Sequence, residues 1–173
     1  MRTNPNRILA INPGTRLLGV AVLEDEALLY YAVKTIKGLR TPLEVLRRIA
    51  AITKQLIEDY EPATISIEQL LPTQRSASLL VVATEEIKVT AKEEGLAVFQ
   101  HDPTAVRRHI CKSDKATKQE TARRIAENYP ELRRYLEHRT KWEALYYANM
   151  FDAVAVGVAA YMEISDTTLP GSN

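Results

Sequence analysis

ILAINPGTRLLGV, residues 8–20, is the stretch of the chain that decides its fold. An apolar run leads into Pro13 and Gly14, and a second apolar run follows directly. Proline suits the first central position of a tight turn and glycine the second, so the pattern predicts two strands joined by a turn. Asn12 ends the first strand, where the adjoining turn holds it stiffly at the end of a sheet.

The rest of the chain predicts an α/β fold with a mixed five-stranded sheet and helices on both faces. Strands are expected at 7–11, 17–23, 27–36, 63–68 and 96–100. Helices are expected from Pro42 to before Pro62, from about Ser76 to Gly95, at 103–110, from Thr117 to Tyr129, and from Thr140 to about Glu163. Thr41 with Glu44 and Thr117 with Glu120 have the spacing of a capping box.

Length and composition predict a single domain over residues 1–165, followed by a flexible tail over 166–173. The 173 residues are 46% hydrophobic and 26% charged, with a net charge of +1. Cys111 is the only cysteine, which excludes an intramolecular disulfide and favours a reducing compartment. The N-terminus lacks the apolar core of a secretory signal, and the longest apolar stretch is about half a membrane span. We therefore expect a cytoplasmic protein that contacts no membrane.

Positive charge is concentrated in one part of the chain. Residues 105–141 contain eleven Lys and Arg but five Asp and Glu, a local net charge of +6. Because the whole chain carries +1, the remainder carries −5. Such a segment is typical of a nucleic-acid surface or of a solvated helix face, and the charge pattern alone leaves both open.

Polar residues are predicted to converge at one edge of the sheet. Asn12 and Glu68 each end a strand, and Asn149 and Asp152 lie three residues apart on one helix face. Asp152 stands in an apolar stretch, where a carboxylate needs a cation or a donor beside it. Oxygen clusters of this kind suit Mg²⁺ or Mn²⁺ in phosphodiester chemistry. Taken singly, each residue is also compatible with a turn, a cap or an ion pair.

Five stretches appear in the order and spacing of the RuvC Holliday junction resolvases, in the ribonuclease H-like superfamily: ILAINPGTRLLGVAV, ISIEQ, DPTAVRR, KATKQETARRIA and DAVAVGVAA. The chain resembles that family over residues 7–160. The resemblance implies a homodimer that binds branched DNA at four-way junctions during recombination and repair, alongside other junction-processing proteins. It also implies that four acids bind two Mg²⁺ ions to nick symmetric strands, and those acids map onto Asn12, Glu68, Asn149 and Asp152.

The resemblance assigns further roles and exposes departures. Glu68 and Asp152 remain as metal ligands, whereas Asn12 and Asn149 are amides at acid positions, so Mg²⁺ or Mn²⁺ binding is expected to be weakened or absent. Lys118 matches a lysine near the catalytic centre. Leu71 replaces a wedge aromatic, CKSDK replaces a glycine-rich turn, and 130–142 is longer than the family's link. The positions expected to contact DNA are Leu71, Arg75, Arg107, Arg108, Lys112 and Lys115.

Three hypotheses follow from these residues. The first is a junction-binding resolvase relative with weak or lost cleavage, which the amides favour. The second is an active metal-dependent endonuclease that tolerates natural or engineered amides or recruits Glu85, Glu86 or Asp102. The third is a regulatory module on the same fold that binds no DNA. The three histidines, His101, His109 and His138, are expected at the surface or facing DNA.

Overall fold

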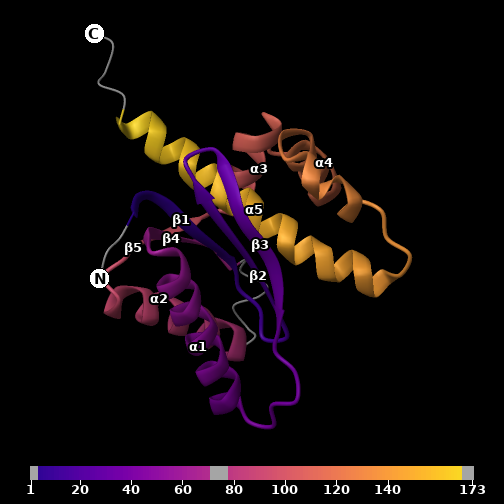
Figure 1. Cartoon of the computed structure of the whole chain (residues 1–173). Helices are drawn as coiled ribbons and strands as arrows, with labels where there is room; N and C mark the ends of the chain where they lie inside the picture. Colours follow the sequence, from indigo (N-terminus) through magenta and orange to yellow (C-terminus); the bar gives the residue numbers. More distant parts are fainter. Residues whose placement is uncertain (1–3, 71–77, 169–173) are drawn as a thin grey trace.

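The structure is a computed structural model that describes residues 4–70 and 78–168. Over these residues it has the predicted α/β architecture (Figure 1). The elements are β1 (Asn4–Asn12), β2 (Leu17–Glu24), β3 (Ala27–Thr35), α1 (Pro42–Tyr60), β4 (Pro62–Glu68), α2 (Ser78–Glu93), β5 (Ala97–His101), α3 (Pro103–Cys111), α4 (Lys118–Asn128), a 3₁₀ helix η1 (Pro130–Tyr135) and α5 (Lys141–Thr168). No helix in the described part of the chain is long and apolar enough to cross a membrane.

The five strands form one mixed sheet in the order β3-β2-β1-β4-β5. The β1–β2 and β2–β3 pairs are antiparallel, whereas β1–β4 and β4–β5 are parallel. The C-terminal ends of β1, β3, β4 and β5 therefore lie at the same edge of the sheet as the start of β2. We call this edge, which carries Asn12, Thr35, Glu68 and His101, the site edge.

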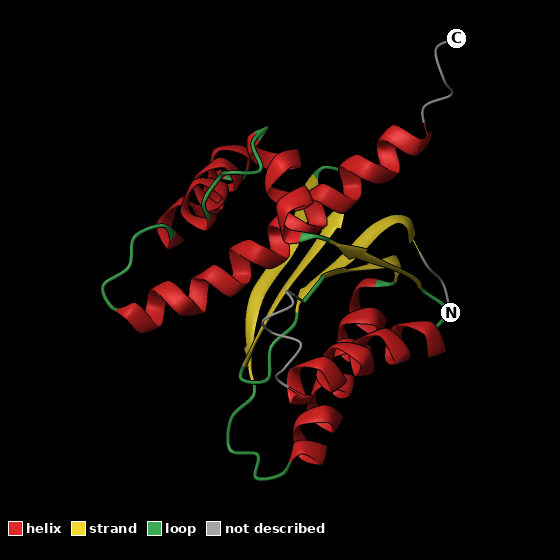
Figure 2. Ribbon diagram, turned by 180° about the vertical axis from the view of Figure 1, so that it is seen from behind, coloured by secondary structure: helices red, strands yellow, loops and turns green. Residues whose placement is uncertain are grey.

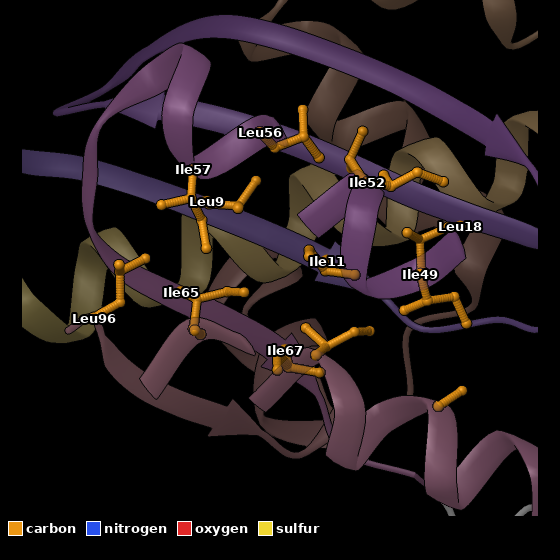
Figure 3. Close-up of a cluster of buried hydrophobic side chains, with 14 of the residues drawn as sticks. Leu9, Ile11, Leu18, Ile49, Ile52, Leu56, Ile57, Ile65, Ile67 and Leu96 are labelled. Atoms are coloured by element: carbon orange, nitrogen blue, oxygen red, sulfur yellow. The ribbon is translucent and has the colours of Figure 1, made fainter. Parts of the chain in front are cut away.

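Helices cover both faces of the sheet (Figure 2). On one face α1 and α2 pack against large aliphatic side chains, including Leu9, Ile11, Ile65 and Ile67 (Figure 3). On the other face α3, α4 and α5 cover Ala10, Ala21 and Leu23. Alternate residues of β1 thus enter different cores, as the two-residue period of a strand requires.

Hydrogen-bonded caps fix where several helices begin, as the sequence predicts. Thr41 with Glu44 and Thr117 with Glu120 both form complete capping boxes at α1 and α4. At α5 the Glu143 backbone N–H donates to Thr140 Oγ1. These caps satisfy N–H groups that the first turn of a helix leaves unpaired.

Some boundaries differ from expectation. The α5 helix continues to Thr168, past the expected helix end near Glu163, and the single domain with a flexible tail from residue 166 stays a prediction. Residues 169–173 lie outside the described residues. The link before α5 contains η1, which the sequence pattern did not predict, because a short 3₁₀ turn has no long apolar period.

Candidate functional site

Two elements bring Asn12, Asn149 and Asp152 together at the site edge. Asn12 ends β1, and the other two residues lie on the side of α5 that faces it. Asn12 Nδ2 donates to Asn149 Oδ1 and to Asp152 Oδ2, both at 3.4 Å. The amide of Asn12 therefore directs a donor at two oxygens, where a carboxylate would direct only acceptors.

Gly19 explains how closely α5 approaches the sheet. Asn12 pairs with Gly19 across the β1–β2 ladder. A Cβ atom at Gly19 would lie 1.9 Å from the backbone oxygen of Asn149 and 3.3 Å from Asn12 Cβ. The helix backbone thus rests directly on β2 beside Asn12. Sequence reasoning missed this role, although a glycine inside an apolar strand signals close backbone approach.

Glu68 joins the cluster from β4, the strand beside β1. Its side chain lines a small cavity together with Arg107, Lys118 and Asp152. Burial and then the nearby Asp152 carboxylate raise the pKa of Glu68 to about 7, although Lys118 and Arg107 oppose the shift. A pKa in this range makes Glu68 able to hold a proton near neutral pH.

Lys118 is the cation that lies against Asp152. It occupies the first position of α4, immediately after the Thr117 cap, and its Nζ forms an ion pair with Asp152 Oδ2. Burial lowers the pKa of Lys118, but the Asp152 carboxylate and then Glu68 outweigh burial, so the pKa lies above its ordinary value. Asp152 therefore has the cationic partner that its apolar surroundings require.

The predicted DNA-contacting residues occupy different places. Arg107 is half-buried at the site and donates to Thr104 Oγ1. Arg108 is exposed on α3 and pairs with Asp114. Lys112 and Lys115 are exposed at the end of α3 and in the connection to α4. Leu71 and Arg75 lie outside the described residues.

The histidine expectation is wrong for His101. This residue ends β5 and is buried at 4% exposure, with its Nδ1 atom 3.3 Å from Glu163 Oε2. His109 is half-buried beside the same carboxylate. His138 is exposed and stacks on Tyr147. His101 is buried because α5 extends across β5, which local sequence does not reveal.

Three acids are alternative candidate ligands for the metal ions, and each of them either forms other contacts or lies on α2. Glu85 pairs with Lys88 on α2, which covers the opposite face of the sheet, and Glu86 lies on the same helix. Asp102 caps α3 by accepting from the backbone N–H groups of Thr104 and Ala105. Across residues 4–70 and 78–168, no group of three or more His, Cys, Asp or Glu is arranged to hold a metal ion.

Comparisons with known proteins agree with the fold. The family model described as "Crossover junction endodeoxyribonuclease RuvC" matches residues 8–134. The RuvC of Moorella thermoacetica is 30% identical over 125 residues, which cover 68% of this chain and 74% of that protein. The Thermus thermophilus RuvC structure superposes with a TM-score of 0.74 at 21% identity, covering 93% of this chain and 97% of that one.

A second Thermus thermophilus structure, of RuvC in complex with a Holliday junction substrate, also has a TM-score of 0.74, at 20% identity. It covers 93% of this chain and 96% of that chain. At these identities the two structures establish the shared fold, and the family model establishes membership. The chain therefore belongs to the RuvC family of Holliday junction resolvases.

Proposed function

We propose that this chain binds branched DNA at four-way junctions and cleaves it weakly or not at all. The observation that carries the proposal is the pair of amides, Asn12 and Asn149, beside Asp152 at the site edge. Membership in the RuvC family supports the junction as substrate class. The amides support the loss of cleavage, because they occupy positions that the family resemblance assigns to acids.

Mg²⁺ or Mn²⁺ is the group that a nuclease of this family would use, and the residues present fit it poorly. Glu68 and Asp152 supply two carboxylates, against four positive charges on two ions about 3.5–4 Å apart. Asn12 turns an N–H donor toward Asp152, and Lys118 already pairs with that carboxylate. We propose that such a site holds at most one metal ion, and holds it weakly. No cleavage step that needs two metal ions follows from it.

The basic segment supports the DNA half of the proposal. Residues 105–141, with a net charge of +6, lie on α3, α4, η1 and their connections, and these elements share the face of the sheet with α5. We propose that Arg107, Arg108, Lys112 and Lys115 contact phosphates around the site, with Leu71 and Arg75 as further predicted contacts. Each phosphate neutralised contributes a slope of about −0.9 in log affinity against log salt.

We also propose that the chain acts as a homodimer. A four-way junction has two-fold symmetry, and two copies of one site match its paired strands. Light scattering at micromolar concentration should then report about twice the 19.5 kDa of one chain. A monomer that persists in the presence of junction DNA would contradict this assembly.

The experiment compares a synthetic four-way junction with a duplex of equal length. Binding is followed by the anisotropy of labelled DNA, and cleavage is followed separately in Mg²⁺ and in Mn²⁺. We expect tighter binding to the junction, a steep decline with salt, and little cleavage with either metal. Lys115→Gln should weaken binding and reduce the salt slope by about one unit, whereas Lys92→Gln, on α2 across the sheet, should change neither.

Two results would overturn the proposal. Equal affinity for junction and duplex, or no affinity for either, would favour a module on this fold that does not recognise junctions. Rapid cutting in Mg²⁺ would favour an active endonuclease with another ligand. Asp102 is the candidate for that ligand, since its charge contributes to the pKa shift of Glu68, although its carboxylate caps α3.

A further inference from the structure

Trp142 is a large aromatic side chain that is exposed at the surface and stacks on a second ring. It lies in the first turn of α5 and is 53% exposed. Its indole stacks on Tyr146, with ring centroids 4.9 Å apart and planes inclined by 27°. The Tyr146 hydroxyl donates to the backbone oxygen of Val33 on β3. Tyr146 therefore ties the stack to the sheet, and more than half of the indole surface faces solvent.

The position of Trp142 relates it to the candidate site. Trp142 and Asn149 are seven residues apart on one helix, which places them on the same side of α5, separated by about 10 Å. That distance equals about three stacked bases at ~3.4 Å each. Figure 1 shows α5 running from its first turns past β3 and β2 across the sheet. A nucleic-acid strand that reaches Asn149 can therefore also reach Trp142.

The charge around Trp142 fits a polyanion. The Lys37 ammonium, two residues beyond the end of β3, lies over the indole ring, 5.8 Å from its centre. Arg139 and Lys141 are exposed on either side of the cap of α5. Glu143, an acid in the same turn, accepts a hydrogen bond from the backbone N–H of Arg139 and is thereby engaged in the cap. An aromatic ring flanked by cations is the arrangement that binds single-stranded nucleic acid.

We propose that Trp142 is a stacking platform for an unpaired base of branched DNA, and that the Lys37 ammonium moves from over the indole ring to the adjoining phosphate when the base binds. The inference rests on the proposed function, since it names a contact that the same DNA would make beyond the site. Bases inside a duplex already stack on both neighbours, so only an unpaired or terminal base offers a free face. Stacking on an aromatic ring is tolerant of sequence, because every base has such a face.

The chain offers a direct readout, because Trp142 is its only tryptophan. Indole emission is recorded while a four-way junction, an oligothymidylate, or a relaxed closed circular duplex, which has neither ends nor unpaired bases, is added. Anisotropy of labelled DNA reports binding independently in the same samples. We expect the junction and the oligothymidylate to quench the emission strongly and the closed duplex to quench it little.

Variants separate stacking from apolar contact. Trp142→Leu keeps an apolar side chain but removes the ring, and should weaken oligothymidylate binding at least about fivefold, the low end for one stacked base. Trp142→Phe should retain most of the affinity. Leu145→Ala, at a position that is 61% exposed on the same helix, is the matched control and should leave binding unchanged.

Each contrary outcome has a distinct meaning. If anisotropy reports binding while indole emission and Trp142→Leu affinity stay unchanged, the stacking inference is wrong and the proposed function stands. If no branched or single-stranded DNA binds, both are wrong. If Trp142→Leu instead lowers the mass measured by light scattering, Trp142 is a contact between protein chains and the inference is wrong.

Discussion

The two faces of the sheet bury different side chains and serve different purposes. Toward α1 and α2 the strands present large aliphatic residues such as Ile11 and Ile67, both fully buried. Toward α5 they present small residues, among them Ala10, Ala21 and Gly19. Large side chains remove more apolar surface from water, whereas small ones let a helix backbone come close. The first face therefore stabilises the fold, and the second sets the position of the site.

The largest effect on stability is expected from the α1–α2 face. Ile11→Ala should lower the free energy of unfolding by about 2–5 kcal/mol, through lost burial and a residual cavity. Urea unfolding measures the change, and Leu29→Ala, at an exposed position on β3, should cost at most about 0.5 kcal/mol. Junction affinity of the folded Ile11→Ala protein should stay unchanged. If the fully folded Ile11→Ala protein bound the junction less tightly, the α1–α2 face would also affect the site, and the two faces would not have separate roles.

The next effect concerns Glu68 and depends on pH. The pKa of Glu68 is about 7 in the folded protein, against 4.5 for an ordinary glutamate side chain, so the folded state holds more protons between these values. The contribution of Glu68 to the free energy of unfolding is fully present below pH 4.5 and is lost as pH rises through 7. The loss amounts to at most about 3 kcal/mol. Glu68→Gln should abolish this loss in metal-free protein, as measured by urea unfolding at a series of pH values.

Glu44 is the matched control for that experiment. Backbone hydrogen bonds from Arg40 and Thr41 lower the pKa of this exposed carboxyl in the α1 cap. Its contribution is therefore present above pH 4.5 and is lost as pH falls, opposite in sign to that of Glu68. A Glu68→Gln protein whose stability still declines between pH 5 and 8 would contradict the burial of this carboxyl beside Asp152.

A smaller effect is expected at Gly19. Gly19→Ala places a Cβ atom against the backbone of Asn149 and should cost about 1–3 kcal/mol while displacing α5 from β1. The side-chain amide resonances of Asn12 and Asn149 should shift in the same variant. Gly157→Ala meets the end of the Leu23 side chain, which can move, and should shift those resonances less. Equal shifts in both variants would show that Gly19 has no special relation to the site.

The smallest effect is expected at the cap that positions Lys118. Thr117→Ala removes the hydroxyl that accepts from the Glu120 backbone N–H, and should cost about 1 kcal/mol. Thr117→Ser keeps the hydroxyl and should cost less. Urea unfolding again distinguishes them. Equal losses in the two variants would indicate that methyl packing, rather than the cap, holds the start of α4.

Several of these structural features could be predicted from the sequence, because they depend on local sequence patterns. Capping boxes at Thr41 and Thr117 and the apolar period of α1 marked helices correctly. The strand ends at Asn12 and Glu68 predicted a shared edge, since parallel strands end together. The juxtaposition of Asn149 and Asp152 with Asn12 also appeared as predicted, although the roles of these residues stay predictions.

What sequence did not reveal depends on contacts between distant elements. Gly19 matters because α5 lies on it, and His101 is buried because α5 continues across β5 beside Glu163. The raised pKa of Glu68 requires Asp152, which lies far along the chain, to come close in space. Such properties follow from tertiary packing, and no local period or cap encodes them.

The proposed loss of cleavage rests on the two amides, Asn12 and Asn149. The measurement is Mg²⁺-dependent cutting of a four-way junction by Asn12→Asp, Asn149→Asp and the double variant. Asn128→Asp, at the exposed end of α4, is the charge control. We expect the double variant to cut the junction, with a gain larger than the two single gains combined, because two metal ions bind as a coupled pair. A folded, junction-binding double variant that cuts no better than the unmodified chain would contradict it.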